Sequence, residues 1–280
     1  MKDFRDKVIA VTGAGSGMGR DMAVQLARRG AKVAISDVDP DGLATTERLV
    51  KEAGGDVHSQ ILNVAEREAV LAWADTVNEH FGSVNAVINN AGIAHNGEVE
   101  TMEFKDIERI MDVDYWGVVN GTKAFLPYVI ASGDGAIVNV SSIFGIAAEP
   151  GQAAYNGAKF AVRGFTESLR QEMLISDHKV AVTCVHPGGI KTAIARNATS
   201  SGDLDSTTAA AFFDKYLART SSPKAAQIIL RAVEKERARV LVGPDAKFID
   251  FSVRLLGSGY QAVSARIMKW GTAYASKHGK

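Results

Sequence analysis

KVIAVTGAGSGMGRDMAVQLA, residues 7–27, is the stretch that decides the fold. The apolar run 7–11 predicts a buried strand, the glycines of 13–19 predict a tight loop, and the apolar spacing that follows predicts a helix. A loop of this kind lets backbone N–H groups approach a diphosphate at the N-terminus of a helix. The spacing is GxxxGxG rather than GxGxxG, so it predicts a variant dinucleotide-binding loop.

A second apolar run, 32–36, ends in Asp37, at the distance from the glycine loop where a dinucleotide-binding fold has an acid for the adenine ribose hydroxyls. A carboxylate there repels a 2′-phosphate. The neighbours Val38 and Asp39 supply no cation, and Arg20 belongs to the start of the helix. The pattern therefore favours NAD over NADP, and the alternative is that Asp37 only opens a turn.

Strands and helices alternate along most of the chain. The pattern predicts strands at 57–62, 85–88, 136–140, 180–185 and 239–242, and helices at 43–53, 66–81, 102–130, 155–175 and 223–236. Such alternation indicates βαβ units around a parallel sheet. We expect one domain over residues 1–245, including a substrate lid at about 193–222, and a C-terminal helical extension over 246–280.

The composition argues against several classes of protein. Of 280 residues, 46% are hydrophobic and 23% charged, and Lys plus Arg equals Asp plus Glu at 32 each. Balanced charge without a basic run argues against binding to nucleic acid. Cys184 is the single cysteine, so we expect no disulfide within the chain and no metal site. Because the N-terminus lacks the apolar region of a signal peptide, we expect a cytoplasmic protein.

Tyr155 and Lys159 lie four residues apart in an expected helix, so their side chains share one face. A phenol with a pKa near ~10 is a poor acid or base at neutral pH, and a fixed cation nearby lowers that pKa. The pair by itself is also typical of an amphipathic surface, so its catalytic interpretation depends on the other motifs.

Taken in order, the motifs resemble those of the short-chain dehydrogenase/reductase family over residues 6–245. They are TGxxxGxG at 12–19, NNAG at 89–92, Ser142 ahead of YxxxK at 155–159, and a proline-glycine turn that ends in Thr192. The resemblance implies an α/β, doubly wound Rossmann fold with a seven-stranded parallel sheet in the order 3-2-1-4-5-6-7 and helices on both faces. It also implies hydride transfer between nicotinamide and a secondary alcohol or ketone.

The resemblance implies a role for each matched residue. Tyr155 would be the general acid or base, Ser142 would orient the substrate oxygen, and Lys159 would lower the phenol pKa and bind the nicotinamide ribose. The other cofactor contacts would come from Gly13, Ser16, Gly17, Met18, Gly19, Asp37, Val38, Asn63, Val64, Asn90, Ala91, Gly92, Pro187, Gly188, Ile190 and Thr192.

Asp114 departs from the family pattern, which has Asn at this place. In relatives that Asn helps to hold a water in a proton relay to the lysine, partly through its backbone carbonyl. An anionic Asp114 would stabilise the Lys159 ammonium and oppose a Tyr155 phenolate. We expect the relay to persist through the backbone carbonyl and the pH optimum to shift upward. Asn63, where many relatives have Asp, can still pair with adenine through its carbonyl.

The residues after the motifs should set the substrate. Besides Ser142 and Tyr155, those expected to contact it are His95, Phe144 and Gln152, with Ile143, Ala147 and Glu149 nearby. Most are apolar, which predicts a hydrophobic secondary alcohol or ketone as the small-molecule substrate. His95 also fits a polar rim residue, and His186 fits a buried histidine whose ring is satisfied.

The extension 246–280 alternates apolar and basic residues at helical intervals. Three interpretations stay open: packing on the protomer or a sister subunit, closure over an apolar substrate, and peripheral membrane contact, the least favoured. The resemblance implies a homo-oligomer, either a tetramer or a dimer. The alternative function is a catalytically weak NAD-binding regulatory or scaffold protein, for which Asp114 is the only sequence support.

Overall fold

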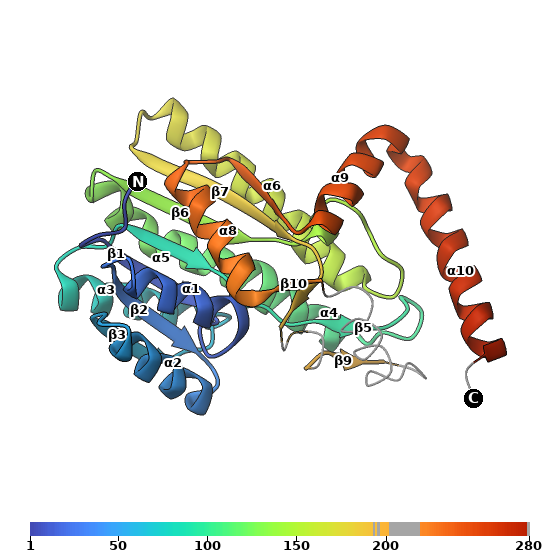
Figure 1. Cartoon of the computed structure of the whole chain (residues 1–280), viewed down its shortest axis with the longest axis horizontal. Helices are drawn as coiled ribbons and strands as arrows, with labels where there is room; N and C mark the ends of the chain where they lie inside the picture. The colour runs from blue at the N-terminus through green and yellow to red at the C-terminus, as the bar shows by residue number, and fades with distance from the viewer. Residues whose placement is uncertain (193, 195–196, 202–218, 279–280) are drawn as a thin grey trace.

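The computed structural model describes residues 1–192, 194, 197–201 and 219–278, with side chains as far as residue 269. Its centre is a sheet of β1 (Val8–Thr12), β2 (Lys32–Asp37), β3 (Val57–Ile61), β4 (Ala86–Asn89), β6 (Gly135–Val140), β7 (Val180–Pro187) and β11 (Arg239–Val242). These strands lie in the order β3-β2-β1-β4-β6-β7-β11, and neighbouring strands run parallel (Figure 1). The predicted seven-stranded order is confirmed.

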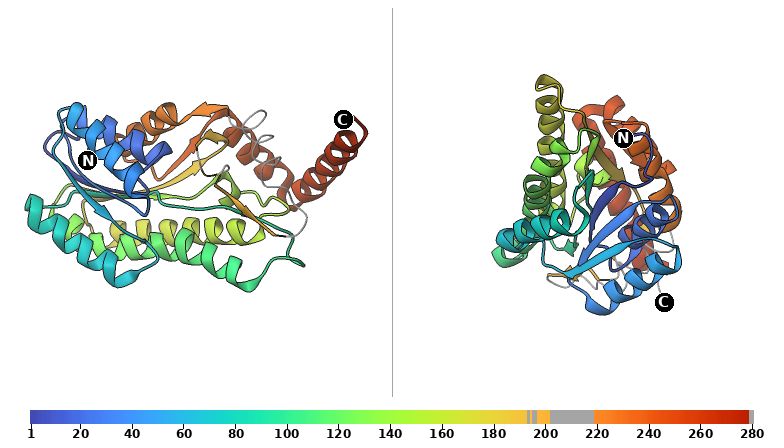
Figure 2. Two further views of the ribbon diagram at one scale, coloured as in Figure 1. Left: turned by 90° about the horizontal axis from the view of Figure 1, so that it is seen from below. Right: turned by 90° about the vertical axis from the view of Figure 1, so that its left-hand side faces the viewer.

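Helices cover both faces of this sheet, as the two views of Figure 2 show. One core contains α1 (Gly17–Ala27), α2 (Pro40–Glu52) and α8 (Ser222–Glu234), and the other contains α3 (Arg67–Phe81), α5 (Gly117–Ala131) and α6 (Ala153–Ile175). Along β1, Ile9 and Val11 enter the first core while Val8 and Ala10 enter the second, because side chains alternate across a strand. The predicted doubly wound arrangement is confirmed.

Local signals explain where α2 begins and where α3 ends. Asp39 caps α2, since its carboxylate accepts the N–H of Asp41 at 3.1 Å, and Pro40 occupies the first helical position. Gly82 ends α3 in the left-handed region with a φ of 78°. The predicted start of α2 at residue 43 is late because the sequence Asp-Pro-Asp is also typical of a turn.

The long helix expected over 102–130 has three parts: α4 (Phe104–Met111), the π-helical turn η1 (Asp112–Trp116), and α5. A Cβ on Gly117 would lie 2.6 Å from Val64 Cγ2, and one on Gly121 would lie 2.0 Å from Asn89 Oδ1. The close packing expected at these glycines is therefore present. The wider turn is a feature that apolar periodicity does not reveal, and such turns are frequent at functional sites.

Two pairs of short parallel strands lie outside the central sheet. β5 (His95–Asn96) pairs with β9 (Thr199–Ser200), and β8 (Ile190–Lys191) pairs with β10 (Thr220–Ser221). Periodicity cannot predict strands of two residues. The lid expected at about 193–222 falls mostly outside the described residues and stays a prediction.

The C-terminal extension is helical, as expected, and consists of α9 (Pro244–Leu256), the short turn η4 (Gly257–Gly259) and α10 (Tyr260–His278). α9 packs beside η2 (Ile143–Gly145), which follows β6. α10 stands away from the layers of the body in Figure 1 and in the left view of Figure 2. In the part of the chain that the structure describes, no helix has the length and apolar character needed to cross a membrane.

The packing at Gly121 predicts a measurable cost for one methyl group. Gly121→Ala should lower the free energy of unfolding by about 1–3 kcal/mol, because its Cβ would collide with the Asn89 amide. Gly164→Ala is the matched control, since nothing lies within 4 Å of its Cβ position on α6; helix propensity should make it neutral or stabilising by about 1 kcal/mol. Urea unfolding measures both, and equal midpoints for the two variants would contradict the assigned packing.

Candidate active site

The predicted site residues gather at one edge of the sheet, where the parallel strands end. The glycine loop follows β1, Asp37 ends β2, Asn63 follows β3, and Ser142 follows β6. The turn after β7 also reaches the glycine loop, because a Cβ on Gly17 would lie 3.2 Å from Thr192 Cγ2. The carboxyl edge is the position of ligand sites in open α/β sheets.

The glycine loop has the backbone that an anion-binding turn requires. Gly13 and Gly17 have φ values of 64° and 51°, in the region that favours glycine. A Cβ on Gly19 would lie 2.1 Å from the Gly13 oxygen. Ser16 precedes α1 without capping it through its side chain, and the first turn of α1 contains no acid. The N–H groups of this turn therefore have no side-chain acceptor from the cap, which fits a diphosphate.

The NNAG turn is fastened to the glycine loop through Thr12. The Thr12 hydroxyl accepts the N–H groups of Asn90 at 3.0 Å and Ala91 at 3.1 Å. The Asn90 amide in turn donates to the backbone oxygens of Thr12 and Gly13. Sequence reasoning assigned Asn90 and Ala91 to the cofactor, whereas Thr12, the first residue of the TGxxxGxG motif, received no role. The two turns thus form one rigid unit.

Asp37 is oriented by the glycine loop. Its Oδ2 accepts the N–H of Gly15 at 2.7 Å. Arg20, the nearby cation, donates to the backbone oxygens of Gly15 and Gly42 and, at 3.0 Å, to the Thr46 hydroxyl. The Arg20 guanidinium is therefore already engaged, and the cations that line the cavity beside Asp37 are Lys105, which pairs with Glu103 at 2.6 Å, and Arg109.

A cavity of about 540 Å³ opens beside Asp37. Its walls come from the carboxyl ends of neighbouring strands and from α4 and η1. The lining residues include Gly13, Asp37, Val38, Leu62, Asn63, Val64, Ala91, Gly92 and Ile93. Seven of these are predicted cofactor residues, and α4 and η1 add the charged residues Lys105, Glu108, Arg109 and Asp112. A carboxylate beside apolar residues such as Val38, Leu62 and Val64 suits an adenosine group. The residues present therefore fit a dinucleotide.

Lys159 and Asp114 form a buried ion pair. Lys159 Nζ lies 3.1 Å from Asp114 Oδ2 and donates to the Val140 oxygen at 3.3 Å. Asp114 Oδ1 accepts the N–H of Ile93 at 2.8 Å. The same ammonium lies 5.5 Å from the centre of the Tyr155 ring. The expected contact between Asp114 and Lys159 is present, and it joins α6, η1 and the ends of two strands.

Electrostatics around Tyr155 differ from the simplest expectation. Burial raises the pKa of its phenol, Lys159 and a hydrogen bond with Ser142 lower that pKa, and Asp114 raises it, so that the phenol pKa ends above its ordinary value. Burial alone would lower the pKa of the Lys159 ammonium, but the charges of Asp114 and Tyr155 outweigh it and raise that pKa. Lys159 is therefore a permanent cation, as expected, while the lowered phenol pKa is not found.

Ser142 is held at the end of β6 by two contacts. Its hydroxyl accepts the N–H of Phe144 at 3.1 Å, and its backbone oxygen accepts His186 Nδ1–H at 2.8 Å. Burial lowers the pKa of His186 to about 4, so the ring is neutral at pH 7. The expectation of a buried, satisfied histidine holds for Nδ1, whereas Nε2 has no hydrogen-bond partner among the described residues.

The turn after β7 is fastened by a residue that sequence reasoning missed. Asp245, in the first turn of α9, accepts the N–H of Gly189 at 2.5 Å. The Gly189 oxygen accepts the N–H groups of Arg219 and Thr220. Gly188 has no room for a side chain, since its Cβ would lie 2.1 Å from Asp245 Oδ2. No sequence signal reveals a contact over such a separation.

The predicted substrate residues differ in what they contact. The Phe144 ring meets the Tyr155 ring edge to face at 6.5 Å between centres. His95 is buried, and its ring nitrogens hydrogen-bond the hydroxyls of Thr199 and Ser201 at 2.8 and 2.7 Å. Gln152 and Asn96 are joined at 3.1 Å through their amides. Phe144 thus borders the phenol, whereas His95 and Gln152 fasten chain segments beside it.

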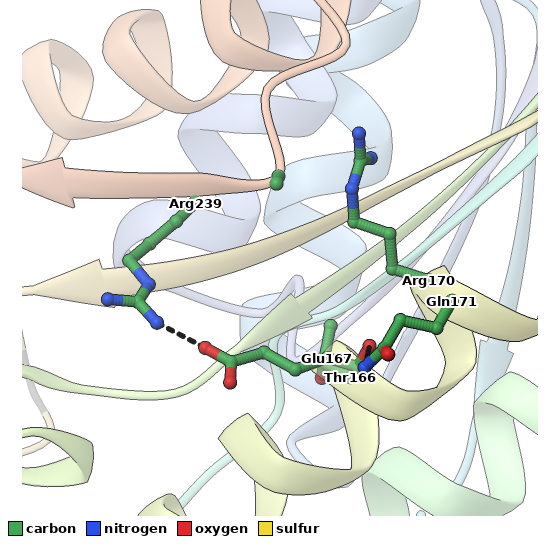
Figure 3. A pocket seen from close by; sticks show the side chains of 6 residues that line it. Thr166, Glu167, Arg170, Gln171 and Arg239 are labelled. Atoms are coloured by element: carbon green, nitrogen blue, oxygen red, sulfur yellow. Dashed lines mark hydrogen bonds and ion pairs between the residues drawn. The ribbon is translucent and has the colours of Figure 1, made fainter. Parts of the chain in front are cut away.

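A second hollow, of about 390 Å³, lies away from this cluster (Figure 3). Its walls are Thr166, Glu167, Arg170, Gln171, Ala238 and Arg239. Arg239 is the first residue of β11, so the hollow lies at the amino end of that strand. Its guanidinium donates to the Glu167 carboxylate. The hollow contains no predicted site residue and sits on the opposite edge of the sheet.

Known proteins with similar sequences are short-chain dehydrogenases and other oxidoreductases. The family model described as short chain dehydrogenase matches residues 7–202. The chain is 62% identical over 265 residues to "Putative oxidoreductase SadH" of Mycobacterium tuberculosis, covering 95% of this chain and 96% of the relative. It is 33% identical to "Uncharacterized oxidoreductase YxnA" of Bacillus subtilis, covering 99% of this chain and 75% of the relative.

Solved structures resemble the fold over nearly its whole length. A short-chain dehydrogenase/reductase from Burkholderia phymatum, in complex with NAD, superposes with a TM-score of 0.85 at 28% identity. The match covers 94% of this chain and 96% of that chain.

The buried ion pair predicts a stability test. Lys159→Met should lower the free energy of unfolding by about 3–5 kcal/mol, because it leaves the Asp114 carboxylate buried without its cation. Adding Asp114→Asn to Lys159→Met should recover part of this loss, since the remaining group is neutral. Urea denaturation of the parent, single and double variants measures the coupling, and strictly additive effects would contradict it.

Proposed function

The chain belongs to the short-chain dehydrogenase family of oxidoreductases, and we propose that it transfers a hydride between NAD(H) and a hydrophobic secondary alcohol or ketone. The observation that carries this proposal is the cluster of Ser142, Tyr155 and Lys159, enclosed beside a cavity that fits adenosine. A hydroxyl donor, a phenol and a permanent cation are the groups that proton exchange with a carbinol oxygen requires.

NAD is the proposed cofactor, and when bound it supplies the acceptor or donor of the hydride. The NAD complex of the Burkholderia phymatum relative supports this choice. The oriented Asp37 carboxylate would accept the adenosine ribose hydroxyls and repel a 2′-phosphate, while Arg20 is engaged by Thr46 and by backbone oxygens. The turns around Gly13, Asn90 and Pro187 would hold the rest of the cofactor.

Tyr155 would move the proton. In alcohol oxidation Tyr155, as the phenolate, would accept the proton of the substrate O–H while the carbon bonded to that oxygen gives up its hydride and becomes a carbonyl; in ketone reduction both transfers would reverse. Ser142 would donate a hydrogen bond to the substrate oxygen. Its backbone oxygen is held by His186 and its hydroxyl oxygen by the N–H of Phe144, so the hydroxyl needs little ordering when substrate binds.

Lys159 retains capacity for the cofactor. An ammonium has three N–H donors. In Lys159 one faces the Asp114 carboxylate and one faces the Val140 oxygen, so the third is left for a ribose hydroxyl. Asp114 would thus act as a positioning residue that keeps the ammonium charged, while the backbone carbonyl at Asp114, within the π-helical turn, would continue the proton relay.

The substrate side of the cluster is apolar. Ile143, Phe144 and Ile146 border Ser142 and are covered by Ile249 and Val253 of α9. A carbon skeleton beside the reacting carbinol would meet this wall, which favours a hydrophobic substrate. We also propose a cytoplasmic homo-oligomer, in keeping with the family resemblance.

A second candidate function is a catalytically weak NAD-binding regulator of the same fold. The raised pKa of Tyr155, due to burial and to the Asp114 charge, favours this alternative because a phenol with a higher pKa loses its proton less readily. The two functions predict the same cofactor affinity but opposite results in an assay of turnover.

Substitution of the phenol separates the two functions. With NAD and NADP assayed in parallel against hydrophobic secondary alcohols, Tyr155→Phe should lower kcat by about 10²–10⁴-fold relative to the parent. Tyr128→Phe, which removes an exposed phenol bonded to Asp75, is the matched control and should retain activity. Calorimetry should give equal NAD affinities for all three proteins. NAD binding by a parent that turns over no alcohol would favour the regulator.

The Asp114 charge predicts the direction of a pH shift. Oxidation requires the Tyr155 phenolate, and Asp114 raises the pKa of that phenol, so Asp114→Asn should lower it. The acidic limb of the kcat/KM profile for oxidation should therefore move to lower pH in Asp114→Asn, with Asp56→Asn, an exposed acid outside the cavity beside Asp37, as control. Coincident profiles for parent and Asp114→Asn would refute this influence.

A further inference from the structure

The helices α9 and α10, with η4 between them, form a C-terminal arm over residues 244–278. The base of the arm is fixed to the body: Ala246 and Val253 pack beside η2, and the Tyr260 hydroxyl accepts the N–H of Ala148 at 2.9 Å. α10 itself stands off from the sheet and its covering helices (Figures 1 and 2). The arm therefore presents surface that its own base does not cover.

The helix α9 carries an outward apolar stripe, and the sequence of α10 has an apolar repeat. On α9, Phe248, Phe251 and Leu255 are spaced by three and four residues and are 71%, 63% and 72% exposed. They lie on the side of α9 opposite Ala246 and Val253. On α10, the apolar positions recur at alternating intervals of three and four residues, namely Tyr260, Val263, Ile267, Trp270 and Tyr274. That spacing is typical of a helix packed along another protein surface.

The arm is also basic. Residues 244–278 contain five Lys and Arg residues and two acids, Asp245 and Asp250, so the rest of this neutral chain, with 32 of each sign in all, has three more acids than bases. Asp250 is buried and pairs with Arg254 at 2.8 Å. The outward charge of the arm is therefore set by cations such as Lys247 and Arg266, both exposed.

A surface of opposite character lies on the body at residues 97–112. It contains the acids Glu98, Glu100, Glu103, Asp106, Glu108 and Asp112 against the bases Lys105 and Arg109. Among these acids, Val99 and Phe104 are 73% and 82% exposed. Large apolar side chains ringed by one sign of charge are typical of protein interfaces. The surface at residues 97–112 therefore has exposed apolar side chains, as the arm does, and carries a net charge opposite to that of the arm.

We propose that the arm of one copy docks on residues 97–112 of a second copy and that the exchange is reciprocal. Such an exchange gives a closed two-fold dimer in which each body receives the other's arm. Lys105, Glu108, Arg109 and Asp112 also line the cavity beside Asp37, so the partner's arm would cover the outer wall of the site. An anionic bilayer is the less fitting occupant, because the acidic body would be repelled by it.

Charge reversal tests this exchange without any assay of turnover, so its outcome is independent of the proposed function. One variant carries Lys247→Glu with Arg266→Glu, and the other carries Glu98→Lys with Glu100→Lys. In each variant alone, like charges meet, and self-association should weaken at least tenfold. In an equimolar mixture every arm meets a body of opposite charge, and association should return. Molar mass by light scattering after gel filtration, at low ionic strength, measures all three.

Matched controls reverse exposed charges far from both surfaces. Lys179→Glu and Glu79→Lys should leave the molar mass unchanged. Ile267→Asp should weaken self-association at least tenfold, in the variant alone and in every mixture, because it removes an apolar contact. Unchanged mass in both reversed variants, or no recovery on mixing, would overturn the proposal. It would also fail if the parent stays monomeric and co-sediments with phosphatidylglycerol vesicles through the arm.

Discussion

The ion pair of Lys159 with Asp114 is the constraint around which the site is built. Both side chains are almost wholly buried, so neither charge is tolerable without the other. The pair connects α6 to the π-helical turn η1, and its remaining contacts reach Val140 at the end of β6 and Ile93 after β4. Four separate chain segments must therefore arrive together before the ammonium is satisfied, and that requirement fixes the phenol one helical turn away.

A second polar network stabilises the same region from within the core. The Asn89 amide donates to the oxygens of Asn139 and Thr122, and the Asn139 amide donates to the Thr166 hydroxyl. These contacts join the ends of two neighbouring strands to the helices α5 and α6. Buried amides are specific only when they are paired, so the network favours one register of strand and helix. Gly121 lacks a side chain where this network needs space.

The sequence predicts the helix and strand positions and the motifs at the carboxyl ends of the strands because these depend on local signals, whereas the strand order is implied by the family resemblance. Apolar periodicity, glycine loops and the spacing from Tyr155 to Lys159 all act within one supersecondary unit. It does not predict the Asp245 contact with Gly189, which depends on how two distant turns approach each other. The sequence also does not reveal that the pKa of the Tyr155 phenol is raised, because the burial of the phenol oxygen depends on the whole fold.

The position of α9 has a consequence for the architecture of the enzyme. The first turn of α9 accepts a hydrogen bond from Gly189, and α9 packs over the segment after Ser142. This helix therefore forms part of the wall of the proposed active site. A shortened protein ending near residue 245 would lose Ile249 and Val253 and open that wall to water. The sheet with its covering helices and α9 therefore share one packed surface, and α9 is structurally part of the body rather than an appendage to it.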